Sequence, residues 1–257
     1  MKPSPTFSSK AKFKIRAWIR LCRVLIETSA FALPGWIKVE CNICGWRGRK
    51  FADFDCGFGH IYHSAACPRC GSHPRHRSLH LYLQQSIPAS MPIRLLHFAP
   101  EASLTALLRS YKNVDYLSVD INPAHAMQKE DITKLSFPDK SFDRVLCIHV
   151  LEHIEDDRKA MSEILRVLKS DGCAILDVPI DYGREQTYED ASIQTPEART
   201  KAFWQGDHVR LYGRDFSQRL EAAGFAVQED PYFDSLGQDV ISRHGLQPTP
   251  FFLCTKG

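Results

Sequence analysis

The sequence has no long apolar run, and this bears on where the protein works. No stretch reaches the roughly 20 apolar residues that a helix needs to cross a bilayer. The nearest approach, residues 18–33, is interrupted by Arg20, Arg23 and Glu27. The pattern of a secretory signal, a clean apolar segment followed by a small-residue cleavage site, is missing as well. We therefore expect neither a membrane span nor a signal peptide.

The cysteines do not form the pattern of a disulfide framework. Nine is an odd number, and four of the nine fall into two C-x-x-C pairs. Secreted disulfide scaffolds use even numbers, whereas C-x-x-C pairs in reducing compartments are typical of metal or redox sites. We expect a cytoplasmic protein.

No strong net charge dominates the chain, yet the charge is unevenly distributed. The formal net charge is +3 over 257 residues, and 44% of the residues are hydrophobic, as in an ordinary globular protein. Residues 1–40 hold eight Lys or Arg against two Asp or Glu, and residues 41–80 hold six against two. The remainder is net acidic. This length fits one large domain, or a medium domain with a small module.

A basic segment, residues 1–36, precedes the rest of the chain, and we expect a helix over residues 10–33. Its apolar residues follow a helical stripe: Ile15, Trp18, Cys22, Ile26 and Ala30. The favoured interpretation is a helix that docks on its own protein. Peripheral contact with an anionic membrane surface, or with nucleic acid, stays open.

Two matching C-x-x-C-G motifs are the strongest local signal in the N-terminal third. They contribute Cys41 and Cys44, then Cys67 and Cys70. Each motif forms a tight turn that presents two thiolates to one point, and four thiolates close the tetrahedral shell of a structural zinc. We expect a zinc ribbon with a β-hairpin between the motifs. Cys56, His60 and His63 lack pair spacing, and we interpret them as loop residues.

A helix follows the second motif, over residues 72–83. It carries Arg75, His76 and Arg77 near its start. This triplet fits a site for phosphate or a substrate acid, and equally a solvated face. Residues 37–87 would then form the ribbon and its connecting helix.

The segment 131–180 predicts a βαβ unit. Residues 142–148 and 174–178 are short apolar runs of the kind found in strands buried on both faces. Between them, Ala160, Met161, Ile164, Leu165 and Leu168 recur at helical spacing, and we expect Gly172 to end that helix. Strand, helix and strand at this spacing indicate a parallel sheet.

This segment resembles a known family. Residues 131–145 (DITKLSFPDKSFDRV), 149–154 (HVLEHI) and 166–172 (RVLKSDG) are similar to class I S-adenosylmethionine (AdoMet) methyltransferases of the type 11 group. The cysteine motifs, R-H-R at 75–77 and L-H-F-A-P-E at 96–101 resemble a subgroup that carries a zinc ribbon. The resemblance implies an α/β fold with a seven-stranded, mostly parallel Rossmann-like sheet over residues 93–257. The last strand, near residues 251–254, would be antiparallel.

The resemblance also implies an AdoMet site, with one departure in its first loop. The family carries an acidic residue and a glycine-rich loop after the first strand, whereas this chain has Phe98-Ala99-Pro100-Glu101. We expect Phe98, Ala99 and Glu101 to meet the cofactor. Glu101 would replace the usual acid and hold the cofactor's ammonium group.

Other cofactor contacts are expected at the ends of the next strands. Asp120 ends the second strand, where a carboxylate can accept both ribose hydroxyls. Too few residues separate it from Asp131 for a helix and a strand, so we expect that helix to shrink to a turn. By resemblance, Asp131 meets the adenine amino group and Ile132 covers the ring. Cys147 and His149, at the end of the fourth strand, complete the set.

The long polar stretch 181–212 is expected to form a lid over the substrate site. His149 and His208 are the candidate bases, because neutral imidazole is available near pH 7. His208, Arg210 and Tyr212 alternate, so an extended segment would point them together into the cleft. Hydrogen-bonding roles for the histidines, and an ordinary surface turn, remain alternatives.

The string His149-x-x-Glu152-His153 also occurs in zinc sites where both histidines lie on one helix. Because His149 is expected to end a strand, we do not interpret this string as a metal site, and we expect His153 to be structural.

The sequence thus predicts an AdoMet-dependent methyltransferase with a structural zinc. The acceptor is unidentified, and a small molecule or glycan-like substrate is favoured. Two alternatives remain. One is an RNA methyltransferase. The other is a non-enzymatic nucleic-acid-binding protein on a degenerate methyltransferase fold, which the glycine-free first loop would favour.

Overall fold

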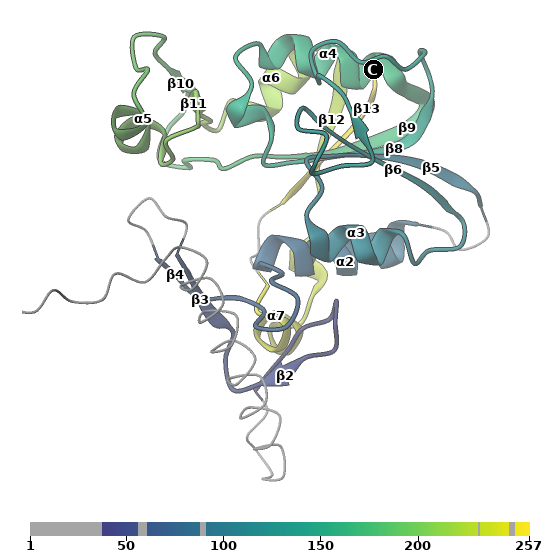
Figure 1. Cartoon of the computed structure of the whole chain (residues 1–257), viewed down its shortest axis with the longest axis vertical. Helices are drawn as coiled ribbons and strands as arrows, with labels where there is room; N and C mark the ends of the chain where they lie inside the picture. The colour runs from purple at the N-terminus through teal and green to yellow at the C-terminus, as the bar shows by residue number, and fades with distance from the viewer. Residues whose placement is uncertain (1–37, 56–60, 88–90, 231, 247–249) are drawn as a thin grey trace, which may run out of the picture.

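The computed structural model describes residues 38–55, 61–87, 91–230, 232–246 and 250–257. The helix expected over residues 10–33, together with Cys56 and His60, lies outside this part of the chain. Figure 1 shows a central sheet with α4 and α6 on one face and α2 and α3 on the other, and the ribbon strands beyond α2 and α7.

A seven-stranded sheet forms the centre of the protein and confirms the predicted α/β class. Its strand order is β12-β13-β9-β8-β5-β6-β7. Every neighbouring pair is parallel except the two made by β13, which is antiparallel to β9 and to β12. The strands are β5 (Ile93–Phe98), β6 (Val114–Asp120), β7 (Gln128–Lys129), β8 (Phe142–Ile148), β9 (Leu168–Asp177), β12 (Phe225–Asp230) and β13 (Phe251–Lys256).

Helices α2 (Pro74–Ser86) and α3 (Ala102–Leu108) cover one face of the sheet, and α4 (Asp157–Val167) and α6 (Phe216–Ala222) cover the other. The other helical elements are α5 (Pro196–Phe203), α7 (Gln238–His244) and the short 3₁₀ turns η1 (Leu151–His153) and η2 (Tyr232–Ser235). Within the described residues, no helix is both long and apolar enough to cross a membrane.

The central strands are apolar because both of their faces are covered. In β5, Leu96 packs into the core on the side of Met161 in α4. Its neighbour Leu95 packs into a second core with Leu79 of α2 and Leu104 of α3. Successive strand residues point to opposite faces, so a strand between two helix layers needs apolar residues at every position.

Gly172 does not end helix α4, contrary to our expectation. The helix ends at Val167 and β9 begins at once with Leu168, so Gly172 lies inside the strand. A Cβ at this position would come within 2.8 Å of a Leu168 methyl carbon and 3.1 Å of the Asp143 carbonyl oxygen. The glycine is there because the backbone passes close to its neighbours, not to cap a helix.

The link between β6 and β7 is short, as predicted. Residues 121–127 form turns and bends without a helix, and β7 has only two residues. The sheet therefore ends on this side in a minimal strand. Helix α7 and turn η2 had no counterpart in the sequence analysis.

The ribbon consists of two small antiparallel pairs. One pair joins β1 (Val39–Glu40) to β2 (Arg47–Gly48), and the other joins β3 (Ala52–Asp55) to β4 (Ile61–Ala66). The second pair is the hairpin predicted between the cysteine motifs. Helix α7 packs against β1, so the chain returns to the ribbon before its last strand, β13, joins the central sheet.

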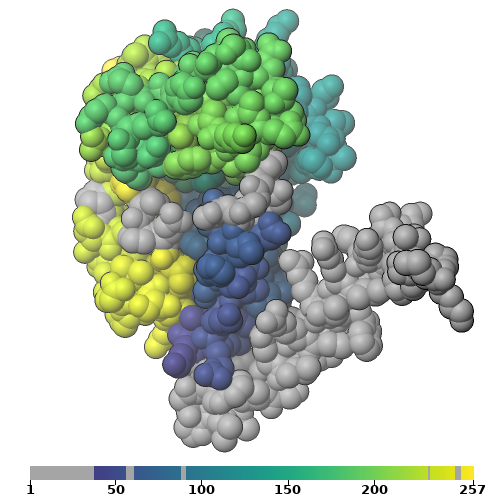
Figure 2. Space-filling model, turned by 90° about the vertical axis from the view of Figure 1, so that its left-hand side faces the viewer, coloured from purple at the N-terminus to yellow at the C-terminus, as the bar shows by residue number. Residues whose placement is uncertain are grey.

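The segment 181–212 is not a plain loop. It contains α5 and two short strands, β10 (Tyr188–Glu189) and β11 (Arg210–Leu211), which pair with each other. In Figure 2 this green segment and the blue ribbon occupy the same side of the molecule, one above the other.

Candidate functional site

A cavity of about 550 Å³ opens at the carboxyl ends of β8 and β9. The ribbon hairpin and the start of α2 form one wall, through Phe54, Tyr62, His73 and Arg75. Phe54 stacks on Tyr62 with 6.3 Å between ring centroids, and its ring meets that of His73 edge-on at 4.3 Å. The predicted zinc module therefore contributes an aromatic wall to the cavity, which the sequence analysis did not foresee.

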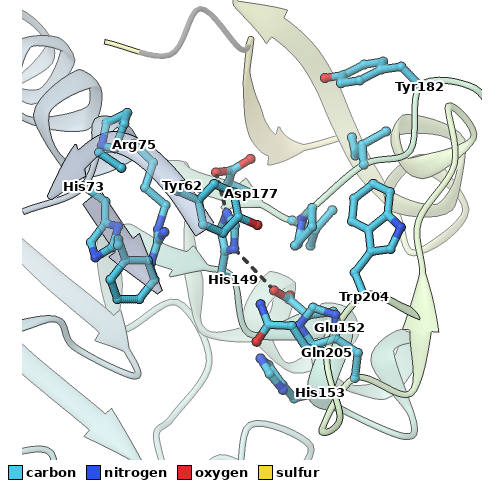
Figure 3. A pocket seen from close by; sticks show the side chains of 17 residues that line it. Tyr62, His73, Arg75, His149, Glu152, His153, Asp177, Tyr182, Trp204 and Gln205 are labelled. Carbon is cyan, nitrogen blue, oxygen red and sulfur yellow. Dashed lines mark ion pairs between the residues drawn. The ribbon is translucent and has the colours of Figure 1, made fainter. Parts of the chain in front are cut away.

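The strand ends and the segment 181–212 form the remaining walls. His149 and Asp177 follow or end the two strands, Glu152 lies on the turn after β8, and Trp204 and His208 come from the segment above. Figure 3 shows His73 and Arg75 on one side, Trp204 and Tyr182 on the other, and His149 and Asp177 between them. Ligands of open α/β sheets bind at this edge, where the strand order reverses between β5 and β8.

The strand-end residues assigned to AdoMet divide into two groups. Phe98 and Cys147 are paired across β5 and β8, but their side chains, like that of Ile132, lie in the core with 6% or less of their surface exposed. Only the backbone of Phe98 and Cys147 is placed to meet a ligand at the strand ends.

Asp120 and Asp131 remain accessible. Asp120 Oδ1 accepts a hydrogen bond from the Asn122 amide at 2.7 Å. Asp131 Oδ1 accepts from the amide and the hydroxyl of Thr133, at 2.9 and 2.7 Å, and these bonds lower the pKa of Asp131. Each carboxylate keeps its second oxygen for another partner. Neither residue lines the cavity described above.

The first loop adopts an unusual backbone conformation. Ala99 has a φ of +44°, in the left-handed region that glycine normally occupies. The loop thus has the geometry of a glycine turn without a glycine.

Glu101 lies among basic side chains. Its Oε1 is 2.9 Å from His76 Nε2 and 3.5 Å from Arg75, and Oε2 is buried without a hydrogen-bond partner, 3.6 Å from His97 Nε2. Burial alone would raise the pKa of Glu101. The close approach of His76 and His97 and the charge of Arg75 outweigh it and hold this pKa well below its usual range. An ionised carboxylate with 23% of its side chain exposed is suited to an ammonium group.

His149 occupies the end of β8 with a φ of +53°. Its amide donates to the Asp177 carbonyl at 2.8 Å, its Nε2 lies 3.7 Å from Asp177 Oδ2, and its Nδ1 lies 3.6 Å from Glu152 Oε1. Burial, and then the charge of Arg75, hold the pKa of His149 well below its usual value. Burial raises the pKa of Asp177 to about 7. Asp177 was not predicted, although it ends β9 just as Asp120 ends β6.

The structure places His208 at the same sheet edge as His149, since both line the cavity. Its Nδ1 is 2.8 Å from the Phe203 carbonyl oxygen, and its ring meets that of His153 edge-on at 4.8 Å. Burial, and then the charge of His153, lower the pKa of His208 to about 4. The imidazole is therefore neutral near pH 7.

The prediction that Arg210 and Tyr212 point into the cleft beside His208 is wrong. The buried Arg210 guanidinium donates to the carbonyl oxygens of Leu151 and Glu155, both at 2.9 Å. Tyr212 is fully buried and donates to Asp157 Oδ2 at 2.8 Å. Strand β11 spans only two residues, so the alternation of an extended strand does not reach from residue 208 to residue 212.

Glu152 was given no role from the sequence, yet its environment is unusual. Its side chain is 1% exposed, and neither carboxylate oxygen has a hydrogen-bond partner. Burial raises the pKa of this carboxyl group to about 8. One ligand atom each from Glu152, His153 and His208 lie within 4.8 Å of one another.

The four cysteines of the two motifs gather at one point. Cys41 Sγ is 3.7 Å from Cys70 Sγ, Cys44 Sγ is 3.6 Å from Cys67 Sγ, and all four sulfur atoms lie within 4.8 Å of one another. Behind each pair a glycine takes a positive φ, +70° at Gly45 and +73° at Gly71. Both turns therefore have the geometry that the C-x-x-C-G pattern predicts.

The central segment of the chain matches a known domain family. Residues 92–176 match the family model of a methyltransferase domain. The matched methyltransferase domain runs from the start of β5 to the end of β9. It includes Ala99, Glu101, Asp120 and His149, but neither the cysteine motifs nor His208.

Two curated relatives match over short segments. The uncharacterized methyltransferase YcgJ of Bacillus subtilis is 45% identical over 49 residues, which cover 19% of this chain and 19% of that protein. The uncharacterized protein MJ0638 of Methanocaldococcus jannaschii is 39% identical over 70 residues, covering 25% and 31%. The matches thus span less than a third of either relative.

Solved structures match over more of the chain. A chain of the complex between the Haloferax volcanii Trm112 methyltransferase activator and a putative methyltransferase has a TM-score of 0.48 and 16% identity, covering 71% of this chain and 90% of that one. The B. subtilis YcgJ structure has a TM-score of 0.45 and 20% identity, covering 71% and 99%.

Proposed function

We propose that this protein is an AdoMet-dependent methyltransferase that acts on a small-molecule or glycan-like acceptor. The observation that carries the proposal is the match of residues 92–176 to a methyltransferase domain, on a sheet whose strand ends border a cavity lined by His149 and His208. The glycine-free first loop was the main argument against it. That argument no longer holds, because the backbone of Ala99 already takes the left-handed conformation that glycine would supply.

The cofactor would lie across the ends of β5, β6 and β8. The ionised, partly exposed carboxylate of Glu101 fits the cofactor's ammonium group, and Asp120 fits the ribose hydroxyls. Asp131 would accept from the adenine amino group. Ile132 would contribute little surface, since it is already packed in the core. AdoMet supplies a methyl group activated by its sulfonium.

The task of the chain is then to align the acceptor and to take up its proton. His149 is the better candidate base, because it is neutral, lines the cavity and is oriented by Asp177. His208 lies across the cavity and contacts the acceptor or the groups that hold it. Both assignments follow from position and protonation state.

The cavity favours a compact acceptor. Its volume of about 550 Å³ is in the range of small-molecule sites. Phe54, Tyr62 and Trp204 offer apolar or stacking surface, while Arg75 supplies a positive charge. A ring-bearing or sugar-like molecule with an acidic group would fit these walls.

We also propose that the cysteine cluster holds a structural zinc. With Zn–S bonds of about 2.3 Å, a tetrahedral site has S···S distances of about 3.8 Å, close to the two measured here. Arg77 supports this assignment. Its guanidinium is fully buried and donates to Ser72 and Ala65 carbonyl oxygens, and among the described residues no carboxylate forms an ion pair with it. A zinc with four thiolates carries two negative charges and would balance this cation.

The proposed activity is tested by methyl transfer from labelled AdoMet. The purified protein would be incubated with small-molecule and RNA fractions of a cell extract, and a deletion strain would be compared by untargeted metabolite and RNA-nucleoside analysis. Label in the small-molecule fraction supports the proposal. Label in RNA alone supports the RNA methyltransferase. A protein that does not bind AdoMet supports the nucleic-acid-binding alternative.

A further inference from the structure

A carboxylate without a partner lies in the wall of the cavity. Glu152 is 1% exposed, and among the described residues neither of its oxygens accepts a hydrogen bond. A basic atom, His149 Nδ1, lies 3.6 Å from Glu152 Oε1, beyond hydrogen-bond distance. Buried carboxylates are costly unless they are paired or bind a metal ion. An ionised Glu152 therefore needs a partner, and the described residues provide none.

Two histidines lie beside this carboxylate with one ring nitrogen each left open. His208 Nδ1 is 2.8 Å from the Phe203 carbonyl oxygen, and His153 Nδ1 is 3.3 Å from that of Asp207. A carbonyl oxygen only accepts hydrogen bonds, so both Nδ1 atoms carry a proton and both Nε2 atoms keep a lone pair. Histidine ligands of metal ions are oriented by the same kind of bond from the other ring nitrogen.

The arrangement is held in place by the chain. The Val209 amide, next to His208, donates to the Glu152 carbonyl at 2.9 Å. Arg210 fixes the same turn through its bonds to Leu151 and Glu155. The turn that carries Glu152 and His153 is thus cross-linked to the segment that carries His208. The three side chains form a preorganised site, not a chance meeting of flexible groups.

We propose that Glu152, His153 and His208 bind one divalent transition-metal cation in the wall of the cavity. Their ligand atoms lie within 4.8 Å of one another, a spacing that one ion can bridge. Two imidazoles and a carboxylate suit Mn²⁺, Fe²⁺ or Zn²⁺ and leave coordination positions open. Under this proposal His153 is a ligand and not only a structural residue, and His208 is a ligand in place of a base.

Glu152, His153 and His208 all line the cavity, so a cation that they hold would be accessible from the space assigned to the acceptor. The role of the cation toward the acceptor rests on the proposed methyl transfer. In that role the cation selects acceptors that offer an oxygen ligand, such as a hydroxyl or carboxylate group. It would hold that oxygen near His149. Metal binding itself does not depend on the methyltransferase assignment, so the two can fail separately.

Mn²⁺ binding tests the site directly. Mn²⁺ is a hard cation and does not compete for the cysteine thiolates, so the ribbon keeps its own metal. The electron paramagnetic resonance signal of free Mn²⁺ would be followed as protein is added. We expect one ion per wild-type chain and an affinity at least ~10-fold lower in His208→Ala and in His153→Ala. His125→Ala, which removes an exposed imidazole outside the cavity, is the matched control and should bind like wild type.

Glu152→Gln keeps the test decisive if an alanine variant folds poorly. It removes the buried charge at almost constant shape, so the metal-free variant should be at least as heat-stable as wild type. Mn²⁺ should raise the Tm of wild type and leave that of Glu152→Gln unchanged. An equal rise in both, or wild type that binds no Mn²⁺, Co²⁺ or Zn²⁺ beyond the ribbon metal, overturns the site. Metal binding without methyl transfer would instead remove only the acceptor role.

Discussion

The guanidinium of Arg210 donates a hydrogen bond to the main-chain carbonyl of Leu151, 59 residues earlier in the chain, at 2.9 Å. This contact joins the segment above the cavity to the turn that follows β8. It fixes the distance between His208 and Glu152, and thereby the geometry of one cavity wall. A single buried cation serves this purpose because it donates to the carbonyl oxygens of Leu151, Ile154 and Glu155 together.

Loss of this cation should destabilise the fold. Arg210→Met removes the hydrogen bonds of the buried guanidinium to the Leu151 and Glu155 carbonyl oxygens, each worth about 1.5–3 kcal/mol because the donor is charged. We expect the free energy of unfolding in urea to fall by roughly 2–4 kcal/mol. Arg214→Met removes an exposed arginine of the same segment and should change it by less than about 0.5 kcal/mol. Similar values for the two variants would contradict the cross-link.

Zinc content should follow the four cysteines. We expect about one zinc per chain in wild type by elemental analysis, and its loss together with solubility in Cys44→Ser and Cys70→Ser, because ribbon folding and zinc binding are coupled. Cys173→Ser is the matched control, since Cys173 lies in β9 outside the cluster. A zinc-free wild type with full circular dichroism would refute the assignment.

His208 should matter for turnover and not for the cofactor. His208→Ala is expected to leave AdoMet affinity within twofold of wild type and to lower turnover by about 10²-fold or more, because loss of the proposed cation would misplace the acceptor. Because His208 is a ligand of the proposed cation, we also expect the turnover of wild type to fall when a chelator removes Mn²⁺ and other divalent ions. A variant with normal turnover would remove His208 from the reaction altogether.

The fold could be predicted from the sequence where the local residue pattern agrees with the tertiary environment. The runs at 142–148 and 93–98 are mostly apolar because helices cover both faces of the sheet, and the structure has strands at both places. The short link after Asp120 was likewise predicted from chain length alone. The cysteine cluster could be predicted because its ligand spacing is local within each motif.

The site could be predicted only in part, because its walls come from distant segments. Nothing in the sequence around Phe54 and Tyr62 shows that this hairpin reaches the cavity beside His149. Gly172 was misread because glycine serves both as a helix end and where backbones pass closely. The burial of Glu152 cannot be predicted from the local string HVLEHI either, since it depends on the segment near residue 208.

Calorimetry with AdoMet tests the central claim most directly. Wild type should bind one AdoMet, and Asp120→Ala should bind it more weakly by about 2 kcal/mol, roughly 30-fold, because a hydrogen bond from the ribose to a charged carboxylate is lost. Asp115→Ala removes an exposed carboxylate from the same strand and should bind as wild type does. Absence of AdoMet binding to the folded, zinc-loaded wild type would contradict the assignment of this protein as a methyltransferase.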